Sequence, residues 1–396
     1  MEQKKFDLNS FIGMLLLGGI LLWWMNTRKP EVTPENTTQT EQVSETTATK
    51  NNTTETPILN DSLQQIALKN KLGAFAYGAA TSKEGVTSIE NDLVKLTIDN
   101  KGGQITEALI KNYKTYDSLP LYLVKDKNAS FNINFGTTDS RILNTKDLPF
   151  IPSVTKNGDL TIVSVKLKVS ESQFLEYRYE IKEGDYMINF NVRSQGLSNV
   201  INSSQEINLD WKLKGYRHAK SISYENRYTD VHYEYEGGKD DYTGARDADE
   251  EIKDVAWIGY KQHFFSSVLL TDRNFKKASI TARNLVDDET IDTVYTKSFA
   301  TKIPLALQAG EINESMDWYY GPSDFNVLNT YGRNLDELVP FGWGLFGWIN
   351  RYIFMPLFTF LGGFMPYGIA IVVMTVLVKI LLSFVQYKQF LSQAKM

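Results

Sequence analysis

Residues 175–192 read LEYRYEIKEGDYMINFNV, and this stretch decides the fold. Apolar side chains occupy alternate positions on both sides of a central turn, Lys182-Glu183-Gly184-Asp185. Strict alternation is typical of a strand with one buried face, and a Gly-containing turn between two such strands predicts a β-hairpin. The stretch therefore predicts two neighbouring antiparallel strands.

The same period of two recurs over most of residues 86–322. Further examples are the apolar positions of residues 94–98, 163–169 and 207–213. Many short strands joined by turns predict an all-β antiparallel sandwich, which we assign to residues 85–322. The chain has 21 Tyr and 21 Phe, and we expect most of these rings in the core or in cross-strand pairs.

Two apolar stretches lie near the ends of the chain. Residues 8–25 contain no charge, and as a helix they span roughly 27 Å, close to the thickness of a bilayer core. We predict an uncleaved membrane anchor within residues 1–30; a cleaved signal peptide is the alternative, but no small-residue cleavage site follows. Residues 367–385 contain one charge, Lys379, and predict a second span. Lysines follow this span directly, which favours a cytoplasmic end.

Residues 31–84 are predicted to be a disordered linker. Residues 31–61 are rich in Thr, Glu, Asn and Gln, and carry six acidic residues against Lys50, a local charge of −5 that equals the charge of the whole chain. Such a composition cannot bury enough apolar surface to offset the entropy of ordering. Because nucleic-acid-binding proteins are basic, we expect no nucleic-acid partner.

Residues 323–365 lose the strand pattern and predict amphipathic helices that lie in the membrane interface. Residues 324–338 are one candidate helix. The aromatic stretch 341–361 follows, and Trp343 and Trp348 near its start are expected to anchor it at the headgroups.

Pro356 interrupts this aromatic stretch, whose single charge is Arg351. A third full span is the alternative, but a helix break at the proline argues against it.

The chain lacks residues that several kinds of catalysis require. The chain has no cysteine, and its three histidines, His218, His232 and His263, are not spaced as a metal pair. We therefore expect no metal and no cofactor. Residues 342–347, GWGLFG, fit the pattern G-x-G-x-x-G, but no strand or βαβ unit precedes them, so a dinucleotide site is rejected.

Lys379 is the most informative single residue. A charge at the centre of a span costs about 2.5–3.5 kcal/mol on insertion scales. Either the side chain faces protein or a water-filled cavity, or its stem reaches cytoplasmic headgroups roughly 9 Å away. The residues alone leave both open.

Several segments together resemble the YidC/Oxa/Alb family of membrane protein insertases, in the form found in Bacteroidetes-like bacteria. The resemblance covers nearly the whole chain and is carried by residues 91–116, 257–265 (WIGYKQHFF), 319–322 (YYGP), 341–343 (FGW) and 371–396. It implies an all-β periplasmic supersandwich, similar in fold to galactose mutarotases and flanked by transmembrane α-helices. Residues 366–396 would be the first helix of the insertase core.

The resemblance also implies a function without covalent chemistry, and hence no enzyme. The family inserts and folds membrane proteins through a hydrophilic groove inside the membrane. Lys379 matches a basic groove residue, which favours the groove over the headgroups, and Thr375 lies one helical turn before it on the same face. Family members continue into further core helices, so we expect the 396-residue chain alone to be inactive.

The partners implied by the resemblance are nascent membrane proteins, the Sec translocon, membrane lipids and the ribosome, the last mainly through the part of family members beyond this chain. The implied location is the bacterial inner membrane, multi-pass, with the sandwich in the periplasm and both termini in the cytoplasm. The alternative is a membrane-anchored periplasmic carbohydrate-binding or epimerase-like domain. A catalytic epimerase would require a His and a Glu that converge in one pocket.

Overall fold

The structure, a computed structural model, describes residues 58–394, and β-strands dominate them. The strands are β1 (Val86–Glu90), β2 (Val94–Asp99), β3 (Ile105–Lys114), β4 (Pro120–Val124), β5 (Ala129–Gly136), β6 (Ile142–Asn144), β7 (Ile151–Asn157), β8 (Leu160–Lys168), β9 (Phe174–Lys182), β10 (Met187–Gln195), β11 (Ile207–Tyr216), β12 (Asp230–Tyr235), β13 (Lys239–Tyr242), β14 (Ala248–Lys261), β15 (Phe265–Asn284), β16 (Tyr295–Leu305) and β17 (Asn313–Pro322). The helices are α2 (Ile58–Leu72), η1 (Gly73–Phe75), α3 (Ala76–Thr81), η2 (Thr145–Asp147), α4 (Ile222–Arg227), α5 (Phe325–Asn329), η3 (Leu335–Leu338), α6 (Gly344–Ile349), η4 (Asn350–Phe354), α7 (Met355–Gly362) and α8 (Tyr367–Ala394).

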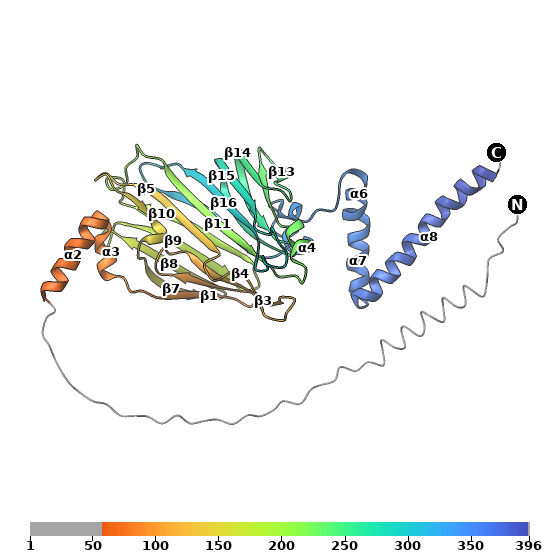
Figure 1. Ribbon diagram of the computed structural model, residues 1–396, viewed down its shortest axis with the longest axis horizontal. Helices are drawn as coiled ribbons and strands as arrows, with labels where there is room; N and C mark the ends of the chain where they lie inside the picture. The colour runs from red at the N-terminus through yellow and green to blue at the C-terminus, as the bar shows by residue number, and fades with distance from the viewer. Residues whose placement is uncertain (1–57, 395–396) are drawn as a thin grey trace, which may run out of the picture. The chain divides into compact units, whose positions relative to one another are not determined.

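The strands form two antiparallel sheets (Figure 1). The smaller has the order β1-β2-β3-β4, and the larger the order β6-β5-β11-β16-β15-β17-β10-β9-β8-β7. A branch of the larger sheet pairs β12 with β13 and β14, and β14 with β15. Apolar side chains from both sheets join one buried cluster. The expected antiparallel β domain is therefore confirmed.

The hairpin predicted from residues 175–192 is β9–β10. Ile188 pairs with Ile181 and Phe190 with Tyr179, as the alternation requires. Gly184 in the turn has a φ of +74°, a conformation that glycine adopts without a steric penalty. A local pattern was enough to fix this register.

Aromatic rings from several strands meet in the core, as predicted. Phe190 stacks on Tyr179 with ring centroids 4.7 Å apart, and its ring lies 5.4 Å from Phe131 and 5.9 Å from Trp318. Each such pair contributes about 0.5–1.5 kcal/mol beyond the burial of its area. These rings therefore serve the packing of the sandwich.

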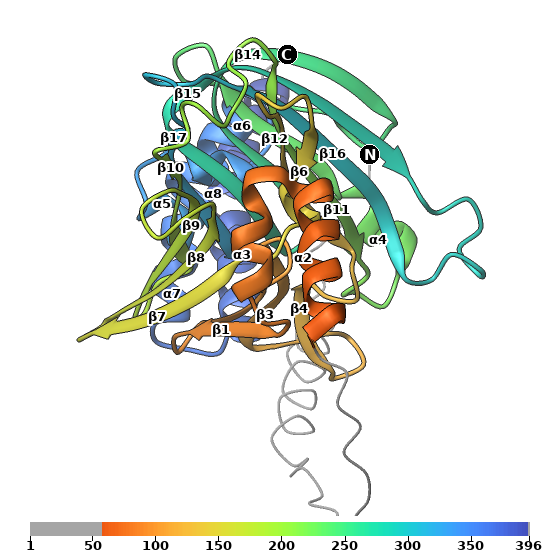
Figure 2. The same cartoon turned by 90° about the vertical axis from the view of Figure 1, so that its left-hand side faces the viewer.

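The chain before β1 is helical. Leu72 is 7% exposed and Phe75 is fully buried, so α2, η1 and α3 pack on the sandwich (Figures 1 and 2). A Cβ on Gly78 would lie 2.6 Å from the carbonyl oxygen of Lys168, which shows how closely α3 approaches β8. The prediction of a disordered linker is wrong for residues 58–81, because apolar side chains at helical spacing find a buried surface there.

The other N-terminal predictions concern residues outside the described part of the chain. These are the membrane anchor, residues 1–30, and the first part of the linker, residues 31–57.

Residues 324–338 do not form the single interfacial helix expected from the sequence. They form α5 and η3, separated by Gly332 and Asn334, whose φ values are +59° and +54°. Leu328 and Leu335 are fully buried in the core of the sandwich. This part of the chain therefore belongs to the sandwich.

Pro356 does not break the aromatic stretch. A proline inside an α-helix removes one donor and clashes with the carbonyl four residues earlier. Here η4, directly before α7, is a π-helical turn in which the Met355 N–H donates to the carbonyl of Asn350. The wider turn accommodates the ring, so helical backbone continues over residues 344–362.

The last helix, α8, has 28 residues and includes the stretch predicted to be the second span. In the part of the chain that the structure describes, no helix is long and apolar enough to be assigned as a membrane span. The span over residues 367–385 therefore stays a prediction.

Candidate functional site

Exposed aromatic and aliphatic side chains gather along residues 341–367, which we call the aromatic segment. Trp343 is 83% exposed and Trp348 is 54% exposed. The other exposed apolar side chains here are those of Leu345, Phe346, Tyr352, Ile353, Phe360, Phe364 and Tyr367. Such a concentration of uncovered apolar side chains is typical of a surface that binds a membrane or a protein. Both predicted anchor residues are therefore free to make such a contact.

The glycines of the G-x-G-x-x-G pattern shape the start of this segment. Gly342 has a φ of +95°. A Cβ on Gly347 would lie only 2.3 Å from the carbonyl oxygen of Gly342, and the Asn350 side chain donates a 2.8 Å hydrogen bond to the carbonyl of Phe341. The pattern thus folds the chain back onto α6, which gives it a structural role.

Arg351 connects the aromatic segment to the sandwich. Its guanidinium donates to Asp336 and, at 2.6 Å, to Glu337 of η3. The same guanidinium lies 5.3 Å from the ring centroid of Phe325. In the sequence, Arg351 stands out only as the single charge of its stretch, because its partners lie in another element.

Thr375 and Lys379, the predicted groove residues, lie one turn apart on α8 and share a face. Both side chains are exposed, and the Thr375 hydroxyl donates a 2.8 Å hydrogen bond to the carbonyl of Ile371. Lys379 forms no ion pair within residues 58–394, and its exposed neighbours on α8 are apolar. The structure brings the two residues together, and their place in a groove stays a prediction.

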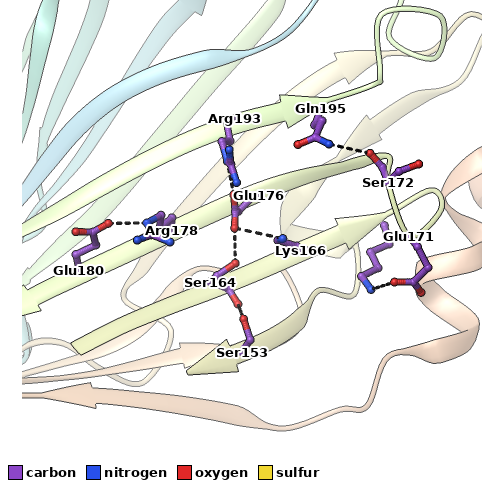
Figure 3. Close-up of polar contacts among 11 residues, drawn as sticks. Ser153, Ser164, Lys166, Glu171, Ser172, Glu176, Arg178, Glu180, Arg193 and Gln195 are labelled. Carbon is purple, nitrogen blue, oxygen red and sulfur yellow. Dashed lines mark hydrogen bonds and ion pairs between the residues drawn. The ribbon is translucent and has the colours of Figure 1, made fainter. Parts of the chain in front are cut away.

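The sandwich has its own polar centre at Glu176, on β9 (Figure 3). The side chain is 2% exposed. It accepts hydrogen bonds from the Ser164 hydroxyl on β8 and from Arg193 on β10, and the Lys166 ammonium lies 3.7 Å away. Glu176 therefore ties three neighbouring strands together.

Hydrogen bonds and charges overcome burial at Glu176. Burial alone would raise the pKa of this carboxyl, but the hydrogen bonds from Ser164 and Arg193 and the charge of Lys166 hold it below its ordinary value. A carboxylate that is ionised and fully partnered has no free proton and no free acceptor for a substrate. We read this cluster as a structural clamp.

A second polar cluster is buried near the WIGYKQHFF stretch. Lys261 is 4% exposed and Lys297 is 1% exposed. The Lys297 ammonium donates a 2.5 Å hydrogen bond to the carbonyl of Thr229, and Lys261 lies 3.7 Å from Asp230. Burial lowers the pKa of Lys297, and the charge of Asp230 opposes that shift. Backbone carbonyls and one carboxylate thus hold two buried ammonium groups.

Two histidines have carboxylate neighbours that the sequence did not reveal. His218 Nδ1 lies 3.6 Å from Glu225 Oε1, and His232 Nε2 lies 3.0 Å from Asp230 Oδ1. His263 instead stacks on Tyr228, with ring centroids 4.8 Å apart.

The pair of His218 and Glu225 is the arrangement that an epimerase-like site would need. Glu225 is 1% exposed, however, and its Oε2 already accepts the backbone N–H groups of His218 and Ala219 at 2.7 and 2.8 Å. His218 Nε2 lies 2.9 Å from the carbonyl oxygen of Tyr122. The pair therefore holds the loop before α4 in place. His218 and Glu225 are only seven positions apart, and this short separation is the one hint of their contact that the sequence carries.

Sequence comparison identifies the family. Residues 86–356 match the model of the YidC periplasmic domain, which is more than half of the chain. The chain belongs to the YidC family. The resemblance seen in the WIGYKQHFF and YYGP stretches is thereby confirmed.

Curated YidC proteins match most or nearly all of the chain. The membrane protein insertase YidC of Parabacteroides distasonis is 31% identical, over 98% of this chain and 65% of that protein. The YidC of Porphyromonas gingivalis is 30% identical, over 98% of this chain and 64% of that protein. The YidC of Phocaeicola vulgatus is 32% identical, over 81% of this chain and 52% of that protein. The chain thus spans between about half and two thirds of the length of these YidC relatives.

Solved structures give weaker likenesses. A galactose mutarotase-like protein from Lactobacillus casei has a TM-score of 0.36 and 13% identity, over 60% of this chain and 100% of its own. A galactose mutarotase related enzyme from Lactobacillus acidophilus has a TM-score of 0.35 and 10% identity, over 60% of this chain and 97% of its own.

Proposed function

We propose that this chain is the anchoring and periplasmic part, with the first core helix, of a membrane protein insertase and chaperone of the bacterial inner membrane. Family membership over 98% of the chain carries the proposal. The structure supports it through the order of its parts, because a β-sandwich leads into an exposed aromatic segment and then into α8.

The proposed topology is multi-pass. Residues 8–25 form the anchor, the sandwich lies in the periplasm, and α8 enters the membrane so that both termini are cytoplasmic. The aromatic segment lies in the outer interface, where Trp343 and Trp348 contact lipid headgroups. The exposure of both rings supports this arrangement.

The proposed mechanism uses Lys379 and Thr375 as the polar side of an intramembrane groove. Hydrocarbon offers no partner for the polar groups of a substrate segment, so a positive charge and a hydroxyl within the membrane lower the cost of its transfer. Thr375 donates to Ile371, which leaves its oxygen lone pairs to accept hydrogen bonds. The step requires no covalent chemistry and no cofactor.

Nascent membrane proteins are the proposed substrates. The Sec translocon, the ribosome and membrane lipids are the proposed partners. A single helix cannot enclose a groove, so we expect insertion only when the further core helices of the longer relatives are supplied.

The test is a chimera in which residues 1–394 are joined to the remaining C-terminal part of the Parabacteroides distasonis relative. It should restore membrane-protein insertion in cells depleted of their own insertase. Lys379→Leu should reduce insertion at least tenfold, whereas Lys379→Arg, which keeps the charge, and Lys388→Leu, outside the proposed span, should retain it. Full activity of the Lys379→Leu chimera would exclude the groove, and activity of the unextended chain would exclude its dependence on further helices.

A further inference from the structure

A cavity of about 530 Å³ lies at the end of the sandwich where several loops meet. Its walls come from the β3–β4 loop, the turn after β4, the end of β11 and the β15–β16 loop. We call it the aromatic pocket, and its apolar and aromatic lining consists of Tyr116, Leu119, Pro120, Tyr122, Tyr216 and Val294.

Contacts within and between the segments that line the aromatic pocket hold its walls in place. The guanidinium of Arg217 lies 4.8 Å from the ring centroid of Tyr116, and the ammonium of Lys125 lies 4.7 Å from that of Tyr122. The backbone N–H of Tyr116 donates to the carbonyl of His218 at 2.9 Å. The pocket is therefore formed before any ligand arrives, which lowers the entropic cost of binding.

A second depression, of about 360 Å³, adjoins the aromatic pocket. We call it the lysine trough, because Lys127, Lys212 and Lys214 line it. Its remaining lining includes small side chains, among them Ser130 and Ser298. The two depressions are neighbours: Lys125 lines one and Lys127 the other in the same turn, and β11 contributes Lys214 to the trough and Tyr216 to the pocket.

The charges that line the two depressions do not balance. Five cationic residues have no ion pair within residues 58–394: Lys125, Lys127, Lys212, Lys214 and Arg217.

Two carboxylates, those of Asp117 and Asp126, also line the pocket. Each accepts a hydrogen bond from a neighbouring hydroxyl, that of Thr115 for Asp117 and that of Tyr216 for Asp126. The local balance is 5 − 2 = +3, in a chain whose total charge is −5. Uncompensated positive charge beside an apolar pocket fits an acidic ligand with an apolar part.

We propose that the aromatic pocket and the lysine trough together bind an acidic, extended segment of a partner polypeptide. One apolar side chain of the segment occupies the pocket, and its carboxylates pair with the lysines of the trough. Lys212 and Lys214 are alternate residues of β11, so they lie roughly 7 Å apart on one face of the strand, as acidic side chains at alternate positions of an extended peptide do. A single lipid phosphate matches neither this spacing nor the extent of both depressions. The proposal goes beyond the proposed function, because it concerns the sandwich and requires no insertion step.

The probe is a short fluorescent peptide in which glutamates alternate with serines and one leucine stands at the end. The full chain in detergent micelles should bind it, the affinity should fall as salt is added, and the same peptide with glutamine for glutamate should not bind.

Reversal of the trough charges tests the contact directly. The double variant Lys212→Glu/Lys214→Glu should weaken binding by about tenfold or more, since charge pairs across an interface are replaced by like charges. The matched control is Lys276→Glu, another exposed lysine on a strand without an ion pair in the described residues, and it should bind as the unchanged chain does. Both changes are at exposed positions, so the free energy of unfolding should be preserved.

The pocket is tested separately. Leu119 is 58% exposed, and Leu119→Ser, which adds no charge, should lower affinity for the peptide with leucine but not for a peptide with alanine in its place. Unchanged binding by the double variant would overturn the proposal. So would a chain that ignores the peptide but binds phosphatidylglycerol vesicles through the same lysines, because the site would then recognise lipid.

Discussion

The sandwich and the C-terminal helices differ in the surroundings of their charged and aromatic side chains. In the sandwich, the buried carboxylate of Glu176 has three polar partners on neighbouring strands, and Phe190 is fully buried among other rings. Along the aromatic segment and α8, Trp343 and its neighbours are exposed, and Lys379 forms no ion pair in the described residues.

The difference shows where each region obtains its stability. A buried charge is tolerated when the fold supplies its partners, and a buried ring gains free energy from the atoms around it. The sandwich provides both internally. Lys379 and the exposed rings of the aromatic segment have neither within the described residues, and a lipid bilayer with further helices is the environment that we propose for them.

The largest expected effect is the difference in stability between two variants, each of which removes one aromatic ring, one in the sandwich and one in the aromatic segment. Phe190→Ala should lower the free energy of unfolding of the sandwich by about 3–5 kcal/mol, because it leaves a cavity in the core. Trp343→Ala should change it by no more than about 0.5 kcal/mol, because the ring is already exposed. Denaturant unfolding in detergent, followed by the β-sheet circular dichroism signal, measures both.

Substitutions at the same two positions should have the opposite ranking when membrane binding is measured instead of stability. Trp343→Ala should weaken the binding of the chain to vesicles, and a folded but weaker core variant such as Phe190→Leu should not. A large loss of stability in Trp343→Ala would mean that the Trp343 ring packs on protein. The proposed difference between the buried ring of Phe190 and the exposed ring of Trp343 would then be wrong.

Local patterns explain which parts of the fold were predictable. The β9–β10 hairpin follows from alternation and from Gly184, all within a few residues. The packing of α2 and α3 was missed because the acidic residues before them dominate the composition of that part of the chain, whereas Leu72 and Phe75 become buried only through a distant surface of the sandwich.

The same limit applies to the candidate site. The positions of Trp343, Trp348 and Lys379 in apolar stretches are visible in a single sequence, whereas the groove role of Lys379 and the choice of Thr375 come from the family resemblance. The partners of Arg351 lie on η3, and the lysine trough joins strands that are far apart in sequence. Contacts of this kind depend on tertiary structure and leave no local pattern.

A smaller effect is expected at Glu176. Glu176→Gln removes the counter-charge of Arg193 and Lys166 and should cost about 1–3 kcal/mol at neutral pH, less than for a fully buried pair because Arg193 is half exposed. Lys156→Gln, at an exposed pair with 3.9 Å between its charged atoms, is the control and should cost no more than about 1 kcal/mol.

The effect should depend on pH in a defined direction. The pKa of Glu176 is lower in the folded chain than its ordinary value of 4.5, so its ionised form stabilises the fold above that value. This contribution is lost as the pH falls through the folded pKa. The difference between the unchanged chain and Glu176→Gln should therefore be constant near neutral pH and should shrink below a pH of about 4.5. A difference that grows on acidification would show that the clamp is absent.

The smallest effect concerns Arg351, the residue that links the two regions. Arg351→Ala removes its hydrogen bonds to Asp336 and Glu337, which we expect to cost about 0.5–2 kcal/mol locally, because the guanidinium is partly exposed. The loss should appear as roughly tenfold faster amide hydrogen exchange in residues 344–362. Exchange in β9 and β10 should not change, because the aromatic segment contributes nothing to their packing. Arg351→Lys keeps the charge but not the two-branched donor, and should give an intermediate rate. Faster exchange in the strands as well would mean that the sandwich depends on the aromatic segment, and the two regions would then form one cooperative unit.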